Sequence, residues 1–246
     1  MAKALRQVVV SEKYSLSPNM QRVVLSGESL ADFPVGYEGG YIKLVLPDEG
    51  EKPAVRSYTI REFDLAEKKL AIDMVAHGDT GPAAYWANHT EAGTSVDIQG
   101  PGACQPINPN ADWFLLAGDM SALPAISVNL EKLPDGAKGH VVLEIISEDD
   151  KVAVPVPQGM SVHWVVNPEP ESNNTVLEDI VTALPWLAGQ VSLWVAGEFS
   201  ASRSLRQYFR NIQQVEKEFK YVSCYWKIGE TDEGMKAAKR ADTDGW

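Results

Sequence analysis

Cysteine is scarce in this sequence, and its scarcity excludes several kinds of site. The 246 residues include two cysteines, Cys104 and Cys224, which lie far apart along the chain. Two thiols are too few for a disulfide scaffold and too few for a zinc or iron–sulfur site. The four histidines show no metal-ligand spacing either. Redox chemistry in this chain therefore needs a bound organic cofactor, and both cysteines are expected to be ordinary buried thiols.

An excess of positive charge is also missing. Lys and Arg number 22 against 34 Asp and Glu, which gives a formal net charge of −12. Nucleic acids and anionic membranes attract basic surfaces, so neither is expected as a partner. No apolar stretch reaches the length of a membrane span, and residues 1–6 lack the apolar core of a secretion signal. The expected location is the cytoplasm.

Short β-rich runs separated by Gly, Pro, Asp or Asn fill the first hundred residues. Their spacing predicts an antiparallel β barrel. One helix interrupts it, with Thr80 as the expected cap and Pro82 in the first turn, where a missing N–H costs nothing. The predicted strands are residues 7–10, 21–26, 41–46, 57–61, 69–75 and 95–99.

After residues 101–102 strands alternate with helices, which is typical of a doubly wound parallel sheet. We therefore expect a barrel domain over residues 1–105, an α/β domain over 106–230 and a tail over 231–246, in which residues 235–241 form a short helix or fray. The predicted strands are 113–117, 141–146, 162–166, 191–196 and 221–227, and the predicted helices are 122–133, 175–184 and 202–215.

The most informative motif is the run Arg56, Ser57, Tyr58 and Thr59. It offers a fixed positive charge, an aromatic face and a short hydroxyl on one strand. Arg56 would take a phosphate, Tyr58 would cover a planar ring and Thr59 would bond to the edge of that ring. A flavin dinucleotide has all three parts. The alternative is an edge strand with an exposed arginine and a packed tyrosine.

Three strand-to-helix turns add to this motif. The helix that starts at Gly81 and Pro82 presents free N–H groups that suit a pyrophosphate, unless it simply closes one end of the barrel. The turns at Asp119 and Glu198 each follow a Gly at the carboxyl end of a strand, where ligands bind in open α/β sheets, although the G-x-G-x-x-G fingerprint is absent. One helix face carries Arg203, Arg206 and Arg210; for Arg210 a solvated surface role is preferred.

Several segments carry a family resemblance. These are residues 22–30, 41–44, 56–61, 77–87, 100–102, 117–124, 194–198 and 225–229. Together they resemble the siderophore-interacting proteins, the flavin-dependent ferric-siderophore reductases of the ferredoxin–NAD(P)H reductase superfamily. The match spans about residues 5–230. Arg-x-Tyr-Thr alone indicates the superfamily, while His-Gly-Asp-x-Gly-Pro and the later Tyr-Trp-Lys narrow it to the siderophore branch. The implied fold is ferredoxin-reductase-like: an antiparallel FAD-binding barrel followed by a parallel-sheet NAD(P)-binding domain.

The resemblance implies a role for each matching position. Arg56 would hold an FAD phosphate, Tyr58 would pack on the isoalloxazine and Thr59 would bond near its N5. The other implied cofactor contacts are Ser57 beside them, Asp73, Val75 and His77 on the adenosine side, Gly81, Pro82, Ala83 and Ala84 at the pyrophosphate, and Asp119 and Ser121 in the second domain.

The sequence departs from the family pattern in two places. Many relatives have Ser where this chain has Ala84, which removes one phosphate hydroxyl but leaves the backbone donors. Met120 and Ser121 stand where Glu and Thr are usual, and this puts the contacts of that turn in doubt.

The resemblance also implies a substrate, Fe(III) held in a siderophore. Reduction to Fe(II) loosens the complex because hard oxygen ligands hold Fe(III) better, and no protein nucleophile or general base is required. A basic rim near the flavin would attract an anionic siderophore, and the alternative for each residue is an ordinary solvated side chain. The candidates are Lys43 and Lys227, with Lys236, Lys239 and Arg240 of the tail adding to the rim or covering it as a lid.

The electron donor is expected to be NADH or NADPH. Glu148, at the end of a predicted strand, suits the free ribose 2′-hydroxyl of NADH, whereas Arg203 or Arg206 would receive the 2′-phosphate of NADPH. We favour NADH. A reduced ferredoxin is a third candidate donor, disfavoured because ferredoxins are generally acidic and this chain is too. The rival functions are a general flavin reductase or electron-transfer flavoprotein of the same superfamily, and a flavin-free siderophore carrier.

Overall fold

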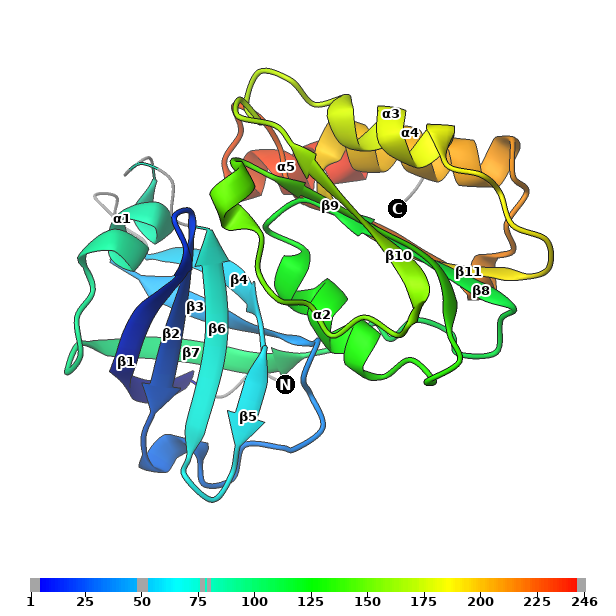
Figure 1. Ribbon diagram of the computed structural model, residues 1–246. Helices are drawn as coiled ribbons and strands as arrows, with labels where there is room; N and C mark the ends of the chain where they lie inside the picture. The colour runs from blue at the N-terminus through cyan, green and yellow to red at the C-terminus, as the bar shows by residue number, and fades with distance from the viewer. Residues whose placement is uncertain (1–4, 48–52, 76–77, 79–80, 243–246) are drawn as a thin grey trace. The chain divides into compact units, whose positions relative to one another are not determined.

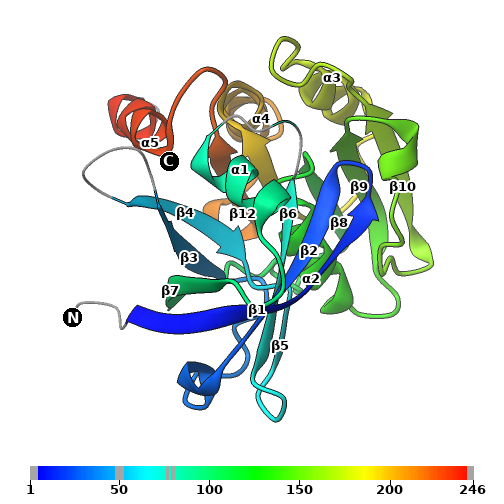
Figure 2. The same cartoon turned by 90° about the vertical axis from the view of Figure 1, so that its left-hand side faces the viewer.

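The computed structural model describes residues 5–47, 53–75, 78 and 81–242, and Figures 1 and 2 show it in two views. The chain divides into two compact units, Met1–Gln105 and Pro106–Trp246. Each unit has its own hydrophobic core, and each is described by itself. In the described residues, no helix is both long enough and apolar enough to cross a bilayer.

The first unit is the expected antiparallel barrel. Across the described residues its sheet runs in the order β4-β3-β7-β1-β2-β6-β5, and β4, at one end of this order, also contacts β6 (Figure 2). Helix α1 (Pro82–His89) and the 3-10 turn η1 (Glu28–Leu30) interrupt the strands. The strands are β1 (Leu5–Ser17), β2 (Met20–Ser26), β3 (Tyr41–Leu46), β4 (Ala54–Thr59), β5 (Glu62–Asp64), β6 (Lys69–Val75) and β7 (Ser95–Gly102).

Strand β3 shows why these residues form a barrel. Ile42, Leu44 and Leu46 are fully buried in the barrel core, and the residues between them are half-buried on the outer face. This alternation matches the two-residue period of a strand with one face on a core. Tyr41 pairs with Gly102 across β3 and β7, and a Cβ at position 102 would lie 2.1 Å from the Tyr41 ring. Glycine at 102 therefore allows that ring to lie against the neighbouring backbone.

Two expectations for the barrel are wrong in detail. The predicted strand 57–61 is β4, which begins at Ala54 and ends at Thr59, and the short strand β5 was not predicted. The ladder ends there because Ile60 N–H donates to the Gly40 carbonyl and the Ile60 carbonyl accepts from Gly39 N–H. The cap of α1 is Gly81 rather than Thr80, which lies outside the described residues. Gly81 has φ +87°, a left-handed conformation that glycine adopts without strain.

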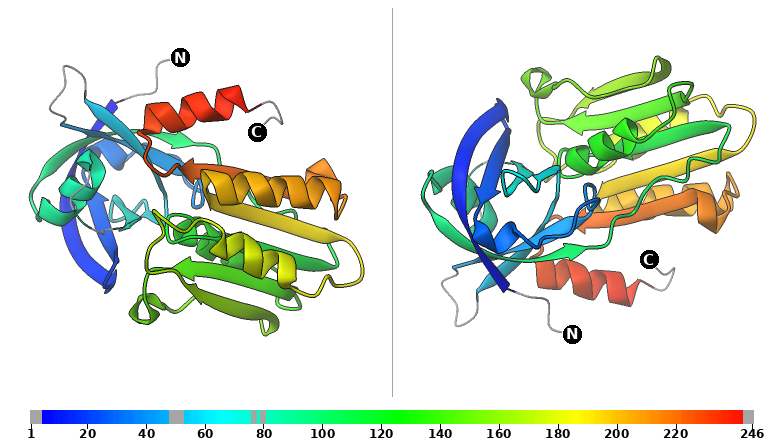
Figure 3. Two further views of the ribbon diagram at one scale, coloured as in Figure 1. Left: turned by 90° about the horizontal axis from the view of Figure 1, so that it is seen from above. Right: turned by 90° about the horizontal axis from the view of Figure 1, so that it is seen from below.

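The second unit is the expected parallel sheet. In the described residues its order is β10-β9-β8-β11-β12, with every neighbouring pair parallel. Helices α3 and α4 lie together on one face of the sheet and α2 lies on the other (Figure 3). Strand β8 is the middle strand of this order, and all six of its residues are buried, as expected for a parallel strand covered on both faces.

The bounds of the second unit's elements differ from the predicted ranges by a few residues at most of the ends. The strands are β8 (Trp113–Gly118), β9 (Lys138–Ile145), β10 (Gly159–Val166), β11 (Val191–Glu198) and β12 (Lys220–Trp226). The helices are α2 (Leu123–Glu131), α3 (Val176–Ala183), α4 (Phe199–Asn211) and α5 (Asp232–Ala241), with 3-10 turns η2 (Glu148–Asp150) and η3 (Lys217–Phe219).

The tail was expected either to form a short helix or to fray, and it forms helix α5. The Thr231 hydroxyl caps it by accepting the Gly234 N–H at 3.1 Å. Met235 is buried with its sulfur 3.5 Å from Cys224 Sγ on β12, and Lys239 Nζ lies 3.3 Å from the Ser223 hydroxyl. The segment is thus an ordered helix docked along β12 (Figure 3), not a frayed end.

Candidate functional site

Strand β4 positions the arginine–tyrosine motif at an edge of the barrel sheet. Arg56 and Tyr58 pair with Leu44 and Ile42 of β3, so both side chains lie on the core side of the sheet. Thr59 points to the opposite face, where it is 9% exposed. The three side chains therefore do not share one face. Because β4 ends the sheet order, one ligand lying along that edge could still reach both faces and the backbone between them.

Tyr58 combines packing with an available ring. It lies against the barrel core, and burial raises the pKa of its hydroxyl while the Arg56 charge lowers it. The phenol is therefore neutral at physiological pH. Arg56 is half-buried and donates to the Val55 carbonyl at 3.1 Å, and within the described residues it has no carboxylate partner. A half-buried arginine without a counter-ion fits the phosphate of a dinucleotide.

The amino terminus of α1 fits a second phosphate. Gly81, the cap, provides no side-chain hydrogen bond, and Pro82, Ala83 and Ala84 bring no polar side chain into the first turn. A Cβ at Gly81 would meet nothing within 4 Å, so the space in front of the helix is open among the described residues. Free backbone N–H groups at an open helix end are the donor set that a pyrophosphate requires.

The expected adenosine-side residues lie at the end of β6. Val75 is half-buried there, and His77 lies outside the described residues. Asp73 accepts two hydrogen bonds from Arg22, at 2.6 and 2.9 Å, and its side chain is almost fully buried. This carboxylate is thus engaged within the barrel, and a direct contact with adenosine would compete with Arg22.

Asp119 has a different environment from the one expected. Its Oδ2 accepts the Trp226 indole N–H at 2.7 Å and the Glu198 N–H at 2.9 Å, and its Oδ1 accepts the Ser121 N–H and hydroxyl. A Cβ at Gly197 would lie 2.7 Å from Oδ2, so glycine is needed beside it. Asp119 thus joins the turn after β8 to the end of β11 and to β12, and both of its oxygens are occupied inside its own unit.

Three buried carboxylates gather at the carboxyl ends of the central strands. Glu198 caps α4 by accepting the Ser200 and Ala201 N–H groups, beside Asp119. Glu144 on β9 was not identified from the sequence, where it lies inside an apolar run. Its Oε1 accepts the Asn167 side-chain N–H at 2.8 Å, and Asn167 also donates to the Asn173 carbonyl. The acid thereby holds the loop after β10 against the sheet.

Glu144 makes stability depend on pH. Burial, then the charges of Asp119 and Glu198, raise its pKa from 4.5 to about 7, although the Asn167 hydrogen bond lowers it. A raised carboxyl pKa stabilises the fold at low pH, and this contribution is lost as pH rises from 4.5 through 7. We expect the unfolding free energy of the α/β unit to fall by about 3 kcal/mol over that range through this group.

The Glu144→Gln variant should lose this pH dependence, because a glutamine keeps the oxygen that accepts from Asn167 and cannot ionise. Urea unfolding at pH 4.5 and 8, followed by tryptophan fluorescence, measures it, since six of the seven tryptophans lie in residues 106–246. Glu148→Gln, on the exposed 3-10 turn after the same strand, is the control. Equal slopes for wild type and Glu144→Gln would contradict the assignment.

The expected nicotinamide residues lie in different settings. Glu148 is exposed in η2 and pairs with Lys151, while Ser147 and Asp150 form a capping box around that turn. Arg206 is buried and donates to Asp242 at 2.7 Å, and Arg203 Nε lies 3.3 Å from the same carboxylate oxygen. Arg210 is exposed, as expected.

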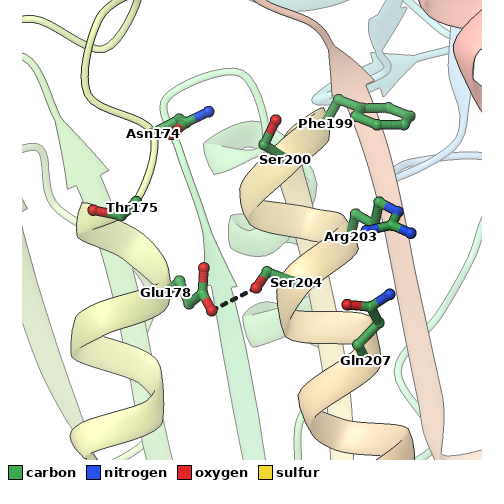
Figure 4. Close-up of a pocket in the computed structure, with 8 residues that line it drawn as sticks. All are labelled: Asn174, Thr175, Glu178, Phe199, Ser200, Arg203, Ser204 and Gln207. Carbon is green, nitrogen blue, oxygen red and sulfur yellow. Dashed lines mark hydrogen bonds between the residues drawn. The ribbon is translucent and has the colours of Figure 1, made fainter.

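A pocket of about 490 Å³ lies between α3 and α4 (Figure 4). In it the Glu178 carboxylate accepts the Ser204 hydroxyl, while Phe199 and Arg203 project from the side of α4 that faces away from α3. The remaining lining residues are Asn174, Thr175, Ser200 and Gln207.

The expected substrate-side cations lie on both units. Lys43 is half-buried on the outer face of β3, opposite Ser57. Lys227 Nζ lies 5.5 Å from the centre of the Phe199 ring, a cation–π distance. The remaining three are on α5, where Lys236 pairs with Asp232, Lys239 contacts Ser223, and Arg240 is exposed.

The described residues contain no group of three or more side chains that could hold a metal ion. His140 Nδ1 and His163 Nε2 lie 3.2 Å apart on β9 and β10, which their sequence spacing did not predict. Both cysteines are free thiols; Cys224 is buried as expected, whereas Cys104 is half-buried. Burial raises the pKa of the Cys224 thiol, so it is protonated and unreactive at neutral pH.

Comparison with known proteins accounts for this arrangement. The family model described as siderophore-interacting protein matches residues 111–229, and the siderophore-interacting FAD-binding domain matches residues 9–53 and 47–105. The chain is 36% identical to the ferric vibriobactin reductase ViuB of Vibrio cholerae, over 96% of this chain and 93% of that protein. It is 28% identical to the ferric acinetobactin reductase of Acinetobacter baumannii, over 76% of this chain and 66% of that protein.

Solved structures agree with both parts of the fold. The siderophore-interacting protein SipS of Aeromonas hydrophila superposes with a TM-score of 0.86 at 31% identity, over 99% of each chain. The ferredoxin reductase in carbazole 1,9a-dioxygenase shares the fold, with a TM-score of 0.65 at 14% identity, over 92% of this chain and 69% of that chain. The chain therefore belongs to the siderophore-interacting protein family, and its amino-terminal barrel is the FAD-binding domain of that family.

Proposed function

We propose that this chain is a ferric-siderophore reductase that uses FAD to pass electrons from a reduced nicotinamide nucleotide to Fe(III) in a siderophore. One observation carries the proposal: the FAD-binding family match over residues 9–105 coincides with 36% identity to a protein named ferric vibriobactin reductase across 96% of the chain. Because reduced nicotinamide nucleotides are cytoplasmic, we assign the reaction to the cytoplasm.

The barrel, residues 1–105, would hold the FAD. Arg56 would pair with a phosphate, and the Tyr58 ring would lie against the isoalloxazine, with Ser57 and Thr59 beside it. Bound FAD supplies hydride acceptance and single-electron transfer to iron. The chain's residues contribute placement: a neutral Tyr58 gives the planar ring an uncharged surface, and the uncapped α1 start at Gly81 to Ala84 receives the pyrophosphate.

Residues 106–230 would bind the nucleotide donor beyond the carboxyl ends of the strands. Glu148 is exposed there and suits a ribose hydroxyl. Asp119 and Ser121 are assigned to positioning rather than to cofactor contact, because they bond each other and the segment around Trp226. The cations Lys43 and Lys227 would attract an anionic siderophore, and residues 231–246 with Lys236, Lys239 and Arg240 would border or cover that surface.

Anaerobic stopped-flow spectroscopy tests the proposal in two halves. NADH or NADPH is mixed with the FAD-loaded protein, and the reduced protein is then mixed with ferric siderophores of the hydroxamate, catecholate and carboxylate classes. Loss and return of the flavin absorbance at rates that depend on nucleotide and on siderophore are expected. Reoxidation by free flavins or quinones but by no ferric siderophore would refute the substrate assignment, and a colourless protein that binds no FAD would refute the cofactor.

A further inference from the structure

Two buried carboxylates fix the chain on both sides of Lys227. Trp226, the last residue of β12, donates its indole N–H to Asp119 Oδ2 at 2.7 Å. Ile228 donates its backbone N–H to Glu198 Oε1 at 3.3 Å. The Glu198 N–H donates to Asp119 Oδ2 at 2.9 Å, so the two acceptors are themselves held together. The backbone of Lys227 is therefore attached to the parallel sheet through both of its neighbours.

The side chain of Lys227 lies over the ring of Phe199. Its Nζ is 5.5 Å from the centre of that ring, within the range of cation–π attraction. Phe199 is the first residue of α4, where the Glu198 side chain caps the helix, and its ring projects on the side of α4 that faces away from α3 (Figure 4). The same glutamate thus starts the helix that carries the ring and anchors the chain next to the lysine.

The charge of Lys227 stays available in this arrangement. No acidic side chain among the described residues forms an ion pair with Lys227, whereas Lys236 of α5 pairs with Asp232. An aromatic ring attracts an ammonium group through its quadrupole and carries no net charge, so it restrains the lysine without neutralising it. A lysine that is already restrained loses less side-chain freedom when it binds an anion than a solvated lysine does. Lys227 is therefore prepared for an anionic ligand, and Lys236 is not.

We propose that Phe199 is a positioning residue for the siderophore: its ring holds the Lys227 ammonium group in place to meet an anionic part of the ferric complex. The inference rests on the proposed reduction of ferric siderophores. Because the ring acts through the ammonium group, its removal should weaken the capture of anionic siderophores and leave the electron transfer that follows unchanged.

Steady-state reduction of two chelates by the FAD-loaded protein, with the nucleotide donor saturating, tests this. The chelates are a hexadentate ferric catecholate, which is anionic, and a hexadentate ferric hydroxamate, whose metal core is uncharged. Phe199→Leu should raise KM for the catecholate about fivefold, because leucine fills similar space and offers no aromatic face. Its kcat for the catecholate and both constants for the hydroxamate should stay at the wild-type values. Phe199→Tyr keeps the ring and should retain the wild-type KM.

A double-mutant cycle shows whether Phe199 acts through Lys227. Lys227→Met removes the ammonium group and keeps an unbranched side chain. In that background Phe199→Leu should no longer change KM for the catecholate. An equal rise of KM in both backgrounds, or an equal rise for both chelates, would overturn the proposal, since a merely structural role of the ring produces these results.

A spectroscopic measurement separates failure of the contact from failure of the proposed function. Reductive methylation with isotope-labelled formaldehyde gives each lysine a dimethylammonium group that keeps its charge. The Lys227 methyl resonance, assigned by its absence in Lys227→Met, should move downfield in Phe199→Leu, where the ring current is lost, and not in Phe199→Tyr. An unmoved resonance would overturn the proposal. Wild-type protein that reduces neither chelate would refute the proposed function, and the inference with it, even where the resonance moves.

Discussion

Replacement of Arg56 by glutamine is expected to weaken FAD binding nearly a thousandfold, a loss of about 4 kcal/mol. The side chain is half-buried beside Tyr58, and within the described residues no carboxylate neutralises it. An FAD phosphate bound there would lose its charge-assisted hydrogen bonds and would stay partly desolvated. Quenching of FAD fluorescence on titration with apoprotein gives the two dissociation constants.

Arg56→Lys should retain part of this affinity, because an ammonium keeps the charge and loses the planar pair of donors. Lys69→Gln makes the same change of net charge on β6, where Lys69 pairs with Glu12, and should bind FAD like wild type. Equal weakening by Arg56→Gln and Lys69→Gln would mean that overall charge, not a phosphate contact, is responsible.

Removal of the Asp119 carboxylate should cost the α/β unit about 4 kcal/mol of unfolding free energy. Asp119→Ala leaves the donors of Trp226, Glu198 and Ser121 without their acceptor, and the site is almost closed to water. The burial that raises the pKa of Asp119 is the same burial that makes these unpaired donors costly. Urea unfolding followed by tryptophan fluorescence measures the loss.

The contribution of one bond can be isolated with Trp226→Phe, which keeps an aromatic ring and removes the indole N–H. We expect a cost of about 1 kcal/mol in wild type and much less in Asp119→Ala, because the bond is already lost there. Asp135→Asn, at an exposed position in the same unit, is the control and should change stability by less than about 0.5 kcal/mol. A loss below about 1 kcal/mol for Asp119→Ala would contradict its proposed positioning role.

Local patterns predicted most of the elements, because their causes lie within a few residues. The bounds of β3 and β6 agree with the predicted ranges because alternating side chains define a strand with one buried face. Helix starts were less accurate. The α4 helix begins at Phe199, three residues before the predicted start, because the Glu198 side chain caps it, and a glutamate cap is not a common signal.

Ion pairs between residues far apart in the chain could not be predicted from the sequence. The residues expected at the adenosine, Asp73, and at the nucleotide phosphate, Arg206, are both engaged in ion pairs with distant residues, Arg22 and Asp242. Each partner lies more than thirty residues away in the sequence, so no local pattern around Asp73 or Arg206 indicates it. Glu144 was missed for the opposite reason, since an acid inside an apolar β run looks like a surface position until its neighbours are placed.

The contact between Tyr41 and Gly102 couples the residue types that these two positions of the barrel can hold. Any side chain added at 102 would overlap the ring at 41, so a larger residue there is compatible only with a smaller one on β3. Position 102 therefore cannot gain a side chain unless residue 41 first becomes smaller, whereas residue 41 can change while Gly102 is kept. Among proteins with this barrel, a residue larger than glycine at 102 should occur only together with a small residue at 41.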